Sequence, residues 1–229
     1  TDLRRRYLQS KLPKVEGKVE APVDQPVCIR RDRWGVAHIE AKSLADCYMG
    51  LGYAMAQDGL WNLDFMRRQA HGRLAEILGP KDLVSDRLHR TVGLTLASEA
   101  AAGAVSDEVG LVLEALSGGI NAGIAAASGR LPVEFDLLGY GPEPWRPVDS
   151  IAIWKWRWWM LTGRLEVIAT GEAARRYLPP HLLDLFLSIE AGEETIVPSE
   201  EPAGAGGYDT GEGSNNWVVG GGRSASASP

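Results

Sequence analysis

The spacing of apolar residues predicts a chain built mainly of helices. One apolar stripe has members three or four residues apart: Val109, Leu113, Leu116, Ile120 and Ile124. This interval places them on one face of a helix. Ser106 precedes the stripe together with Asp107 and Glu108, and the positive end of the helix dipole favours acidic side chains there. We therefore expect a helix that begins at residues 106–108.

Two short strands are predicted near the start of the chain, after a polar arm over residues 1–25. Residues 26–29 and 36–41 are strand-like and flank a turn around Gly35, which is typical of a hairpin. Ser43 with Asp46 three residues later matches a capping box and predicts the start of a helix. Glycines weaken that helix, so we expect it to pack closely against another element.

A third long helix is predicted in the tryptophan-rich part of the chain, with Asp149 as its cap. One of its faces is apolar: Trp154, Trp158, Leu161, Leu165 and Ile168. Because Trp156 and Trp159 lie elsewhere on the cylinder, the helix is expected to be buried on several sides. Shorter helices are predicted over residues 73–78, ended by Gly79-Pro80, and 181–189, after Pro179-Pro180.

The composition changes at residue 192. Residues 192–213 are rich in Gly, Glu, Pro, Ser and Thr, a composition too poor in apolar side chains to pack on its own. Residues 214–219 then form a strand candidate that Gly220-Gly221-Gly222 closes. The pattern therefore divides the chain into residues 1–191, a linker over 192–213, and a final segment over 214–229.

Charge and apolar content disfavour some partners. The formal net charge is -6, whereas binding phosphates requires a basic face, so no nucleic-acid partner is expected. The best candidate for a membrane span, residues 151–161, is short and interrupted by Lys155 and Arg157, so no membrane partner is expected either. Cys28 and Cys47 could form one bridge, but two separate buried thiols are the favoured interpretation.

The usual ways of activating a serine are missing from the sequence. It contains no GxSxG, HExxH, P-loop or GxGxxG motif, and its four histidines lie in no catalytic motif. Gly213-Ser214 offers another way. If the Ser214 hydroxyl attacks the preceding carbonyl, the peptide becomes an ester that water splits. The freed α-amine, with a reference pKa of about 7.7–8, can then activate its own hydroxyl. On spacing alone, a linker that simply ends at a strand is the better interpretation.

Several stretches resemble the penicillin acylase (penicillin amidase) family of N-terminal nucleophile hydrolases. Residues 213–219, Gly-Ser-Asn-Asn-Trp-Val-Val, are similar to that family's α/β junction. Further stretches of this chain resemble its α chain: residues 29–39, followed by 54–61 and 66–76, and residues 141–150. Their order along the chain is that of the family. Ala37 and Gly59 depart from the residues common there, Pro and Arg, and neither change touches the expected chemistry.

The resemblance implies an α+β fold, the αββα sandwich of N-terminal nucleophile hydrolases in the full protein, with this segment mostly α-helical with a few short strands. It identifies residues 1–191 as an α-chain segment, residues 192–213 as a spacer, and residues 214–229 as the start of a β chain. Gly213 and Ser214 would be the cleavage site, with Ser214 as the catalytic nucleophile. The oxyanion-hole side chain would lie beyond Pro229, so this segment alone would be incomplete, and the β chain would be its partner. The resemblance also implies a periplasmic or secreted protein.

The same resemblance supplies candidates for ligand binding. Trp158, Met160 and Arg164 would contribute to an acyl-binding pocket, although most of the tryptophans in this helix are expected to be core residues. No cofactor is implied for catalysis. A structural calcium ion would take Glu172, with Glu166 as the competing candidate, but calcium needs six or more oxygen ligands.

The function implied is hydrolysis of an amide that joins an acyl group to an amine, such as the side chain of a β-lactam antibiotic. A cephalosporin acylase or an acyl-homoserine-lactone acylase is the alternative within the same family. The alternative from another class is an inactive fragment or a module that only binds acyl compounds.

Overall fold

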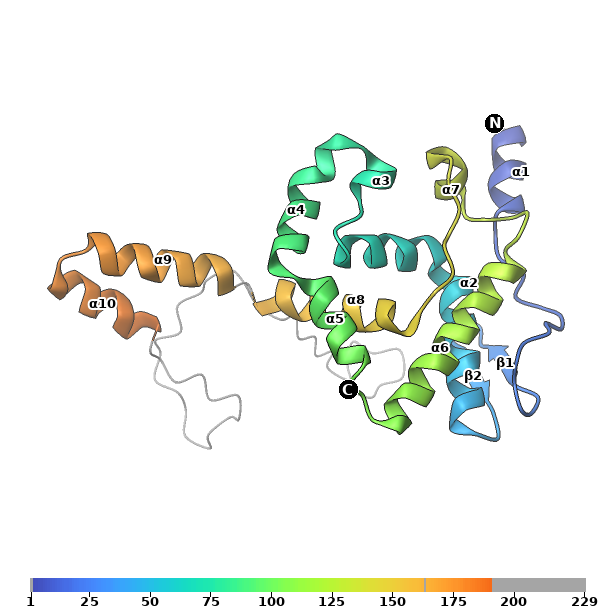
Figure 1. Ribbon diagram of the computed structural model, residues 1–229. Coiled ribbons are helices and arrows are strands. Elements are labelled where there is room, and N and C mark those ends of the chain that lie inside the picture. Colours follow the sequence, from blue (N-terminus) through green and yellow to red (C-terminus); the bar gives the residue numbers. More distant parts are fainter. Residues whose placement is uncertain (1, 163, 191–229) are drawn as a thin grey trace, which may run out of the picture. The chain divides into compact units, whose positions relative to one another are not determined.

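The computed structural model describes residues 2–162 and 164–190, which divide into two compact units that meet between Arg164 and Leu165. Both contain mainly helix (Figure 1). The elements of the first unit are α1 (Asp2–Ser10), β1 (Cys28–Arg31), β2 (Ala37–Glu40), α2 (Leu44–Ala70), α3 (Ala75–Leu78), the 3₁₀ turn η1 (Pro80–Asp82), α4 (Leu83–Val92), α5 (Leu94–Ala102), α6 (Asp107–Ala126), α7 (Val133–Leu138) and α8 (Pro147–Thr162). Helix α9 (Arg164–Tyr177) begins at the boundary between the units, and α10 (Pro180–Glu190) follows it in the second unit.

The predicted hairpin is confirmed. Strands β1 and β2 pair antiparallel, with Ile29 opposite Ile39. In the turn, the Asp32 carboxylate accepts hydrogen bonds from the backbone amides of Trp34 (2.9 Å) and Val36 (3.0 Å). Gly35 has a φ of 85°, which a residue without a Cβ atom adopts readily. The sequence of this turn therefore fixes the register of the two strands.

Helix α2 begins at the predicted cap, but only one of the two hydrogen bonds of the predicted capping box forms. The Ser43 side chain accepts a hydrogen bond from the Asp46 amide (3.1 Å). The Asp46 carboxylate bonds to the backbone amides of Asp24 (2.9 Å) and Gln25 (3.2 Å), not to Ser43. A buried carboxylate needs more than one donor, and the preceding chain supplies them, so Asp46 attaches the N-terminal segment to α2.

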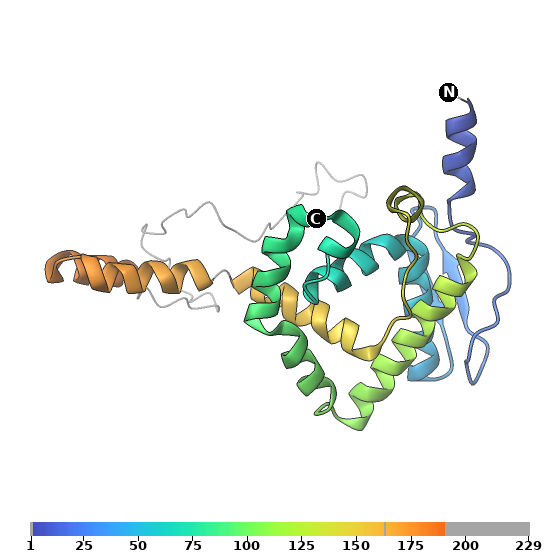
Figure 2. The same ribbon diagram turned by 45° about the horizontal axis from the view of Figure 1, so that its top comes forward.

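Helices α2 and α6 lie side by side in both views (Figures 1 and 2), and glycines bring their backbones together. A Cβ atom on Gly52 would lie 2.2 Å from the Leu116 carbonyl oxygen, and one on Gly119 would lie 2.0 Å from the Met49 carbonyl oxygen. The close packing predicted from the glycines of α2 is therefore confirmed. Ser106 caps α6 as expected, accepting a hydrogen bond from the Val109 amide (3.4 Å).

The core of the first unit consists of two apolar clusters. The first fills the space between α2, α6, α7 and the segment before α8, with Ala56, Leu60, Leu63, Ile120, Phe135 and Trp145. The second joins the end of α2 to α5 and α8, with Ala70, Leu94, Ala152 and Trp156. Together they fix the position of α8 relative to α2.

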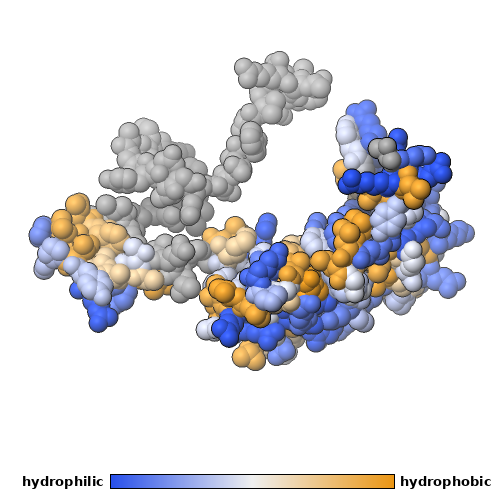
Figure 3. Space-filling model, turned by 90° about the horizontal axis from the view of Figure 1, so that it is seen from above, coloured by the Kyte–Doolittle hydropathy of each residue, from blue (hydrophilic) through white to orange (hydrophobic). Residues whose placement is uncertain are grey.

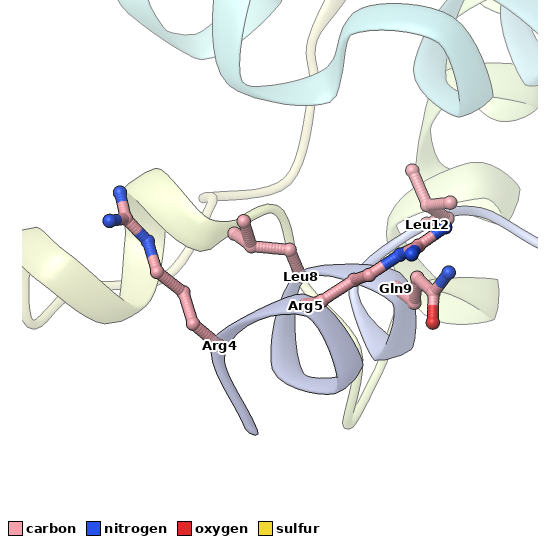
Figure 4. Close-up of a pocket in the computed structure, with 5 residues that line it drawn as sticks. All are labelled: Arg4, Arg5, Leu8, Gln9 and Leu12. Carbon is pink, nitrogen blue, oxygen red and sulfur yellow. The ribbon is translucent and has the colours of Figure 1, made fainter. Parts of the chain in front are cut away.

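Several expectations for the first unit need correction. Residues 2–10 form α1, where a polar arm was expected, although none of its residues is buried. The basic and apolar side chains of α1 line only a shallow hollow, in which Arg5 points toward Leu12 and Arg4 points away (Figure 4). Both cysteines are free as expected, but the expected burial is wrong, because Cys28 is exposed and Cys47 is only half-buried.

The expectation about membrane spans also needs correction. Helix α6, and not residues 151–161, is the described helix whose length and composition match those of a membrane span. Its small residues Gly119 and Gly123 are buried against α2, and a close helix–helix contact of this kind accounts for the apolar face. Apolar side chains also reach the surface at several places between polar ones (Figure 3).

Candidate functional site

The apolar side chains of α8 divide between a buried face and an exposed one. Ala152 and Trp156 are buried against α5 and the end of α2. Trp154 and Trp158 are each 63% exposed, and their ring centroids lie 5.4 Å apart with the planes tilted by 34°. Met160 is 42% exposed. Burial of α8 on several sides was expected and is wrong for the described part of the chain, because its neighbours cover only the face that carries Trp156.

A histidine locks the buried face of α8 to α4. Trp156 Nε1 donates to His89 Nε2 (3.1 Å), and His89 Nδ1 lies 3.4 Å from Ser85 Oγ. The Trp159 ring meets the His89 ring edge-on at 5.4 Å. Burial lowers the pKa of His89, against the smaller raising effects of Ser85 and the Asp86 charge. A neutral His89 is the form that accepts the bond from Trp156.

The first turn of α8 is fixed by Asp149, which is buried. Pro147 is the first residue of the helix, so Asp149 lies inside the first turn and is not the cap that the sequence suggested. Its carboxylate accepts hydrogen bonds from the Arg146 amide (2.9 Å) and bonds to His71 Nε2 (3.1 Å). Burial alone would raise the pKa of Asp149, but these bonds and the charges of Arg67 and Arg146 lower it below its usual value.

Arg67 connects the end of α2 to the segment that precedes α8. Its guanidinium pairs with Asp64 and with Asp149 (3.4 Å). It also donates to the backbone carbonyls of Glu143 (3.2 Å) and Pro144 (3.1 Å). Because the side chains of Arg67, Asp64 and Asp149 are all almost fully buried, each charge depends on the others for compensation.

The outer part of this network is partly exposed. Arg73 pairs with Glu143 (2.7 Å) and with Glu76 (2.8 Å), and Arg68 pairs with Glu76 (2.8 Å) and Asp64 (2.9 Å). The hydrogen bond from Arg73 and the surrounding arginine charges lower the pKa of Glu143 to about 2, while burial acts in the opposite direction. Glu143 is therefore ionised throughout the neutral range.

The buried ion network joins two of the stretches that the sequence analysis singled out. Arg67, His71 and Glu76 belong to residues 66–76, and Glu143 and Asp149 belong to residues 141–150. The sequence analysis identified both stretches but not their pairing. The opposite charges of the two stretches were the only signal of their pairing. The local pattern does not show which residues form ion pairs when 70 or more positions of sequence separate them. The network holds the start of the helix that carries Trp154, Trp158 and Met160.

The remaining predicted site residues lie in the second unit or have side chains outside the described residues. Arg164 is the first residue of α9, and its side chain, like that of Glu166, lies outside the described set. Glu172 is exposed on α9 and pairs with Arg175 (3.6 Å). Gly213 and Ser214 lie outside the described residues, as do the predicted segment boundaries after residues 191 and 213.

The described residues give little support to a calcium site. Within residues 2–162 and 164–190, no group of three or more His, Cys, Asp or Glu side chains could hold a metal ion. Glu172 would supply only one or two of the six or more oxygens that calcium takes. Its role as a calcium ligand stays a prediction.

Comparisons with known proteins agree on one family. The model of the family described as penicillin amidase matches residues 26–229. The chain is 34% identical to the penicillin acylase 2 proenzyme of Pseudomonas sp. (strain SE83), over 98% of this chain and 32% of that protein. It is 37% identical to the acyl-homoserine lactone acylase QuiP of Pseudomonas aeruginosa, over 56% of this chain and 15% of that protein. The chain therefore spans about a third or less of the length of these curated relatives.

A solved structure has a similar fold. It is a thermostable penicillin G acylase from Alcaligenes faecalis in tetragonal form, which matches with a TM-score of 0.62 and 27% identity. The match covers 79% of this chain and 99% of the matched chain. The expected fold class, an α+β hydrolase fold to which this segment contributes mostly helices and a few short strands, is confirmed. The chain belongs to the penicillin amidase family.

Proposed function

We propose that the complete protein is an acylase that hydrolyses an amide between a hydrophobic acyl group and an amine, after it has cleaved itself between Gly213 and Ser214. The observation that carries this proposal is the family match, which runs through the Gly213-Ser214 junction to residue 229. The relatives that match are named as acylases, and one of them is named as a proenzyme.

The self-cleavage step needs only groups of the junction itself. The Ser214 hydroxyl oxygen attacks the carbonyl carbon of Gly213, the peptide C–N bond breaks, and the nitrogen leaves as the α-amine of Ser214. Water then hydrolyses the resulting ester, which releases the Gly213 carboxylate and restores the hydroxyl. The attack is favoured because both groups belong to one chain and are held close together.

The new α-amine then acts as the base for the amide substrate. It takes the proton of the Ser214 hydroxyl as the oxygen attacks the substrate carbonyl, and it passes that proton to the departing amine. Water hydrolyses the acyl ester in a second step of the same kind. A free α-amine has a reference pKa of about 7.7–8, so a useful fraction is unprotonated near neutral pH.

The exposed face of α8 is our candidate for acyl recognition. Trp154 and Trp158 present neighbouring aromatic rings, and Met160 adds a flexible apolar side chain. Aromatic and thioether groups suit flat or extended apolar acids. The buried network around Arg67 and Asp149 supports this assignment, because it holds the start of α8 in place. The contribution of Arg164 to the acyl-binding pocket stays a prediction, and so does export of the protein.

Acyl-homoserine lactones are the second candidate substrate class. Proteins named as acyl-homoserine lactone acylases match this chain at 34–37% identity over 129 residues, a range that includes the identity to the penicillin acylase 2 proenzyme. Cephalosporin amides belong to the same reaction type. Penicillin side-chain amides, cephalosporin amides and acyl-homoserine lactones all contain an amide between an acyl group and an amine. The proposed chemistry is therefore common to the three classes.

The test uses the complete protein and three amides: phenylacetyl, glutaryl and hexanoyl derivatives of one chromogenic amine. The parent should separate into two chains, the second beginning Ser-Asn-Asn-Trp, and should release the amine from at least one substrate. Ser214→Ala should do neither, whereas Ser224→Ala, a serine ten positions away, should do both. Hydrolysis of the amides by the Ser214→Ala variant would overturn the assignment of Ser214 as the nucleophile. An uncut, inactive parent would favour the inactive or purely acyl-binding alternative.

A further inference from the structure

A cavity of about 650 Å³ lies between the N-terminal segment and the paired helices α2 and α6. Tyr53, Ala56 and Leu60 of α2 form part of its wall. Ala122 and Ala126 contribute from α6. The cavity has the size of a small-molecule site, and it lies apart from α8, because no residue of α8 lines it. From the sequence, a polar arm was expected up to residue 25 and a strand over residues 26–29, and no cavity was expected beneath them.

The segment that covers the cavity, residues 11–31 and here called the strap, is fastened to α2 at three points, one of which is the pair between Arg31 and Asp58 (2.8 Å). Near its start, the Gln57 side chain donates a hydrogen bond to the Lys14 carbonyl (2.7 Å). Near its end, the buried Asp46 carboxylate accepts the bonds from Asp24 and Gln25 described above. The strap therefore forms one wall of a cavity whose other wall is the α2–α6 pair.

The charges around the cavity are unbalanced. Its polar lining includes five cations and one carboxylate: Lys11, Lys14, Lys18, Arg31, Arg130 and Glu16. Lys11 pairs with Asp136, and Arg31 pairs with Asp58 (2.8 Å). Lys14, Lys18 and the half-buried Arg130 form no ion pair with any carboxylate in the described part of the chain. Three free cations opposite one carboxylate favour an anionic ligand.

Tyr53 adds a donor on the apolar side. Burial raises the pKa of the Tyr53 hydroxyl, and a hydrogen bond to Gln57 lowers it by less. The hydroxyl is therefore protonated at neutral pH and can donate to an acceptor. The apolar wall around it consists of alkyl side chains, among them Leu60 and Ala126, so the ligand must combine an apolar body with an acidic group.

We propose that this cavity binds a monocarboxylate with an extended apolar chain. The carboxylate lies among Lys14, Lys18 and Arg130, and the chain lies along Ala56, Leu60 and Ala126 under the strap. The match rests on volume, on the apolar wall and on charge complementarity. It goes beyond the proposed amide hydrolysis, because it assigns a second binding site that involves neither Ser214 nor α8.

The test titrates decanoate, below its micelle concentration, into the complete protein by calorimetry. Ala126→Phe puts a ring into the cavity, and Ala125→Phe puts the same ring on the exposed neighbouring position of α6 that does not line it. Arg130→Gln removes a free cation, and Arg87→Gln removes an exposed one on α4. We expect Ala126→Phe and Arg130→Gln each to raise the Kd about tenfold or more, whereas both controls bind as the parent does.

Three outcomes would overturn the proposal. One is the absence of saturable decanoate binding by the parent, which is expected if another part of the complete protein fills the cavity. The second is an unchanged Kd in both Ala126→Phe and Arg130→Gln. The third is a Kd that rises in Trp158→Ala but not in Ala126→Phe, which would place decanoate on α8. Amide hydrolysis is measured for the same variants, so failure of the second site and failure of the proposed catalysis are seen separately.

Discussion

At the scale of single residues, Arg67 contacts four polar groups of the buried network at once. Two are the carboxylates of Asp64 and Asp149, and two are the carbonyls of Glu143 and Pro144. A buried charge that loses its partner costs far more than an exposed pair contributes. The stability of this part of the chain should therefore depend strongly on one guanidinium.

Arg67→Met tests this dependence. Methionine fills much of the same space but leaves Asp64 and Asp149 short of a cation, so we expect a loss of about 3–5 kcal/mol in the free energy of unfolding. The measurement is denaturant unfolding of the complete protein. Arg87→Met, on the exposed surface of α4, serves as the control and should change stability by about 0.5 kcal/mol or less. Equal changes in the free energy of unfolding would show that the buried network contributes no more to stability than an exposed arginine does.

His89 makes the stability of the first unit sensitive to pH. Its pKa in the folded protein is lowered by burial, so the unfolded chain binds a proton more readily than the native one. The stabilisation is complete above the unfolded pKa of about 6.5 and is lost as the pH falls from there toward the folded pKa. The free energy of unfolding should decrease with acidification through this window, by up to about 1.4 kcal/mol per pH unit. The thermal midpoint should decrease with it.

His89→Gln should remove this part of the pH dependence, because glutamine has no proton to gain while its carbonyl can still accept from Trp156. His181→Gln changes an exposed histidine on α10 and should leave the slope unaltered. The check is a set of thermal melts of the complete protein between pH 5 and about 7.5. If the slope persists in His89→Gln, another group is responsible.

At the scale of elements, the α2–α6 pair depends on residues that have no side chain. A Cβ atom on Gly119 would meet the Met49 carbonyl oxygen at 2.0 Å and the Tyr53 amide nitrogen at 2.9 Å. Backbone atoms cannot yield as a flexible side chain can, so the helices would have to separate. Gly119→Ala should therefore lower the free energy of unfolding by about 1–3 kcal/mol.

Gly110→Ala provides the matched control in the same helix. A Cβ atom there meets nothing nearer than a Val105 methyl at 4.0 Å, so alanine should stabilise the helix by about 0.4–1 kcal/mol. Both variants are compared with the parent by the denaturant midpoint of the complete protein. Opposite signs support close backbone packing, and a gain in both variants would exclude it.

How far each element could be predicted depended on what it buries. The hairpin and α6 carry apolar patterns or turn residues of their own, so local sequence was sufficient. Helix α4 was missed because its buried residues are Asp86 and His89, while Val84 and Leu88 are exposed. Its residues violate the usual pattern of apolar inside and polar outside. Helix α5 buries Leu94 and Ser98 among alanines, which gives little periodicity to detect.

At the scale of the whole molecule, the face of α8 decides how the candidate site is interpreted. The sequence favoured a core role for most of its tryptophans, since large aromatic residues are usually buried. The structure supports that role for Trp156 and, in part, for Trp159, which packs against the same cluster, whereas Trp154 and Trp158 are exposed in the described part of the chain. Which face would be covered could not be predicted from α8 itself, because its apolar residues surround the whole cylinder.

Met160 gives the sharpest test of the proposed acyl-binding role. If it contacts the acyl group, Met160→Ala removes apolar surface from one class of substrate more than from another. We expect the ratio of kcat/KM for hexanoyl and phenylacetyl amides of the same amine to change about five- to tenfold, equivalent to about 1–1.4 kcal/mol. Stability should fall by less than about 1 kcal/mol, because the side chain is 42% exposed.

The matched control is Leu88→Ala on α4, where the side chain is 41% exposed and lies outside the candidate site. It should change stability by a similar small amount and leave the ratio of the two kcat/KM values as it is in the parent. A core role for Met160 predicts the reverse pattern, namely a loss of about 2–5 kcal/mol in stability with an unchanged ratio. Because the two roles differ in which quantity moves, thermal melts and kinetics on one pair of variants separate them.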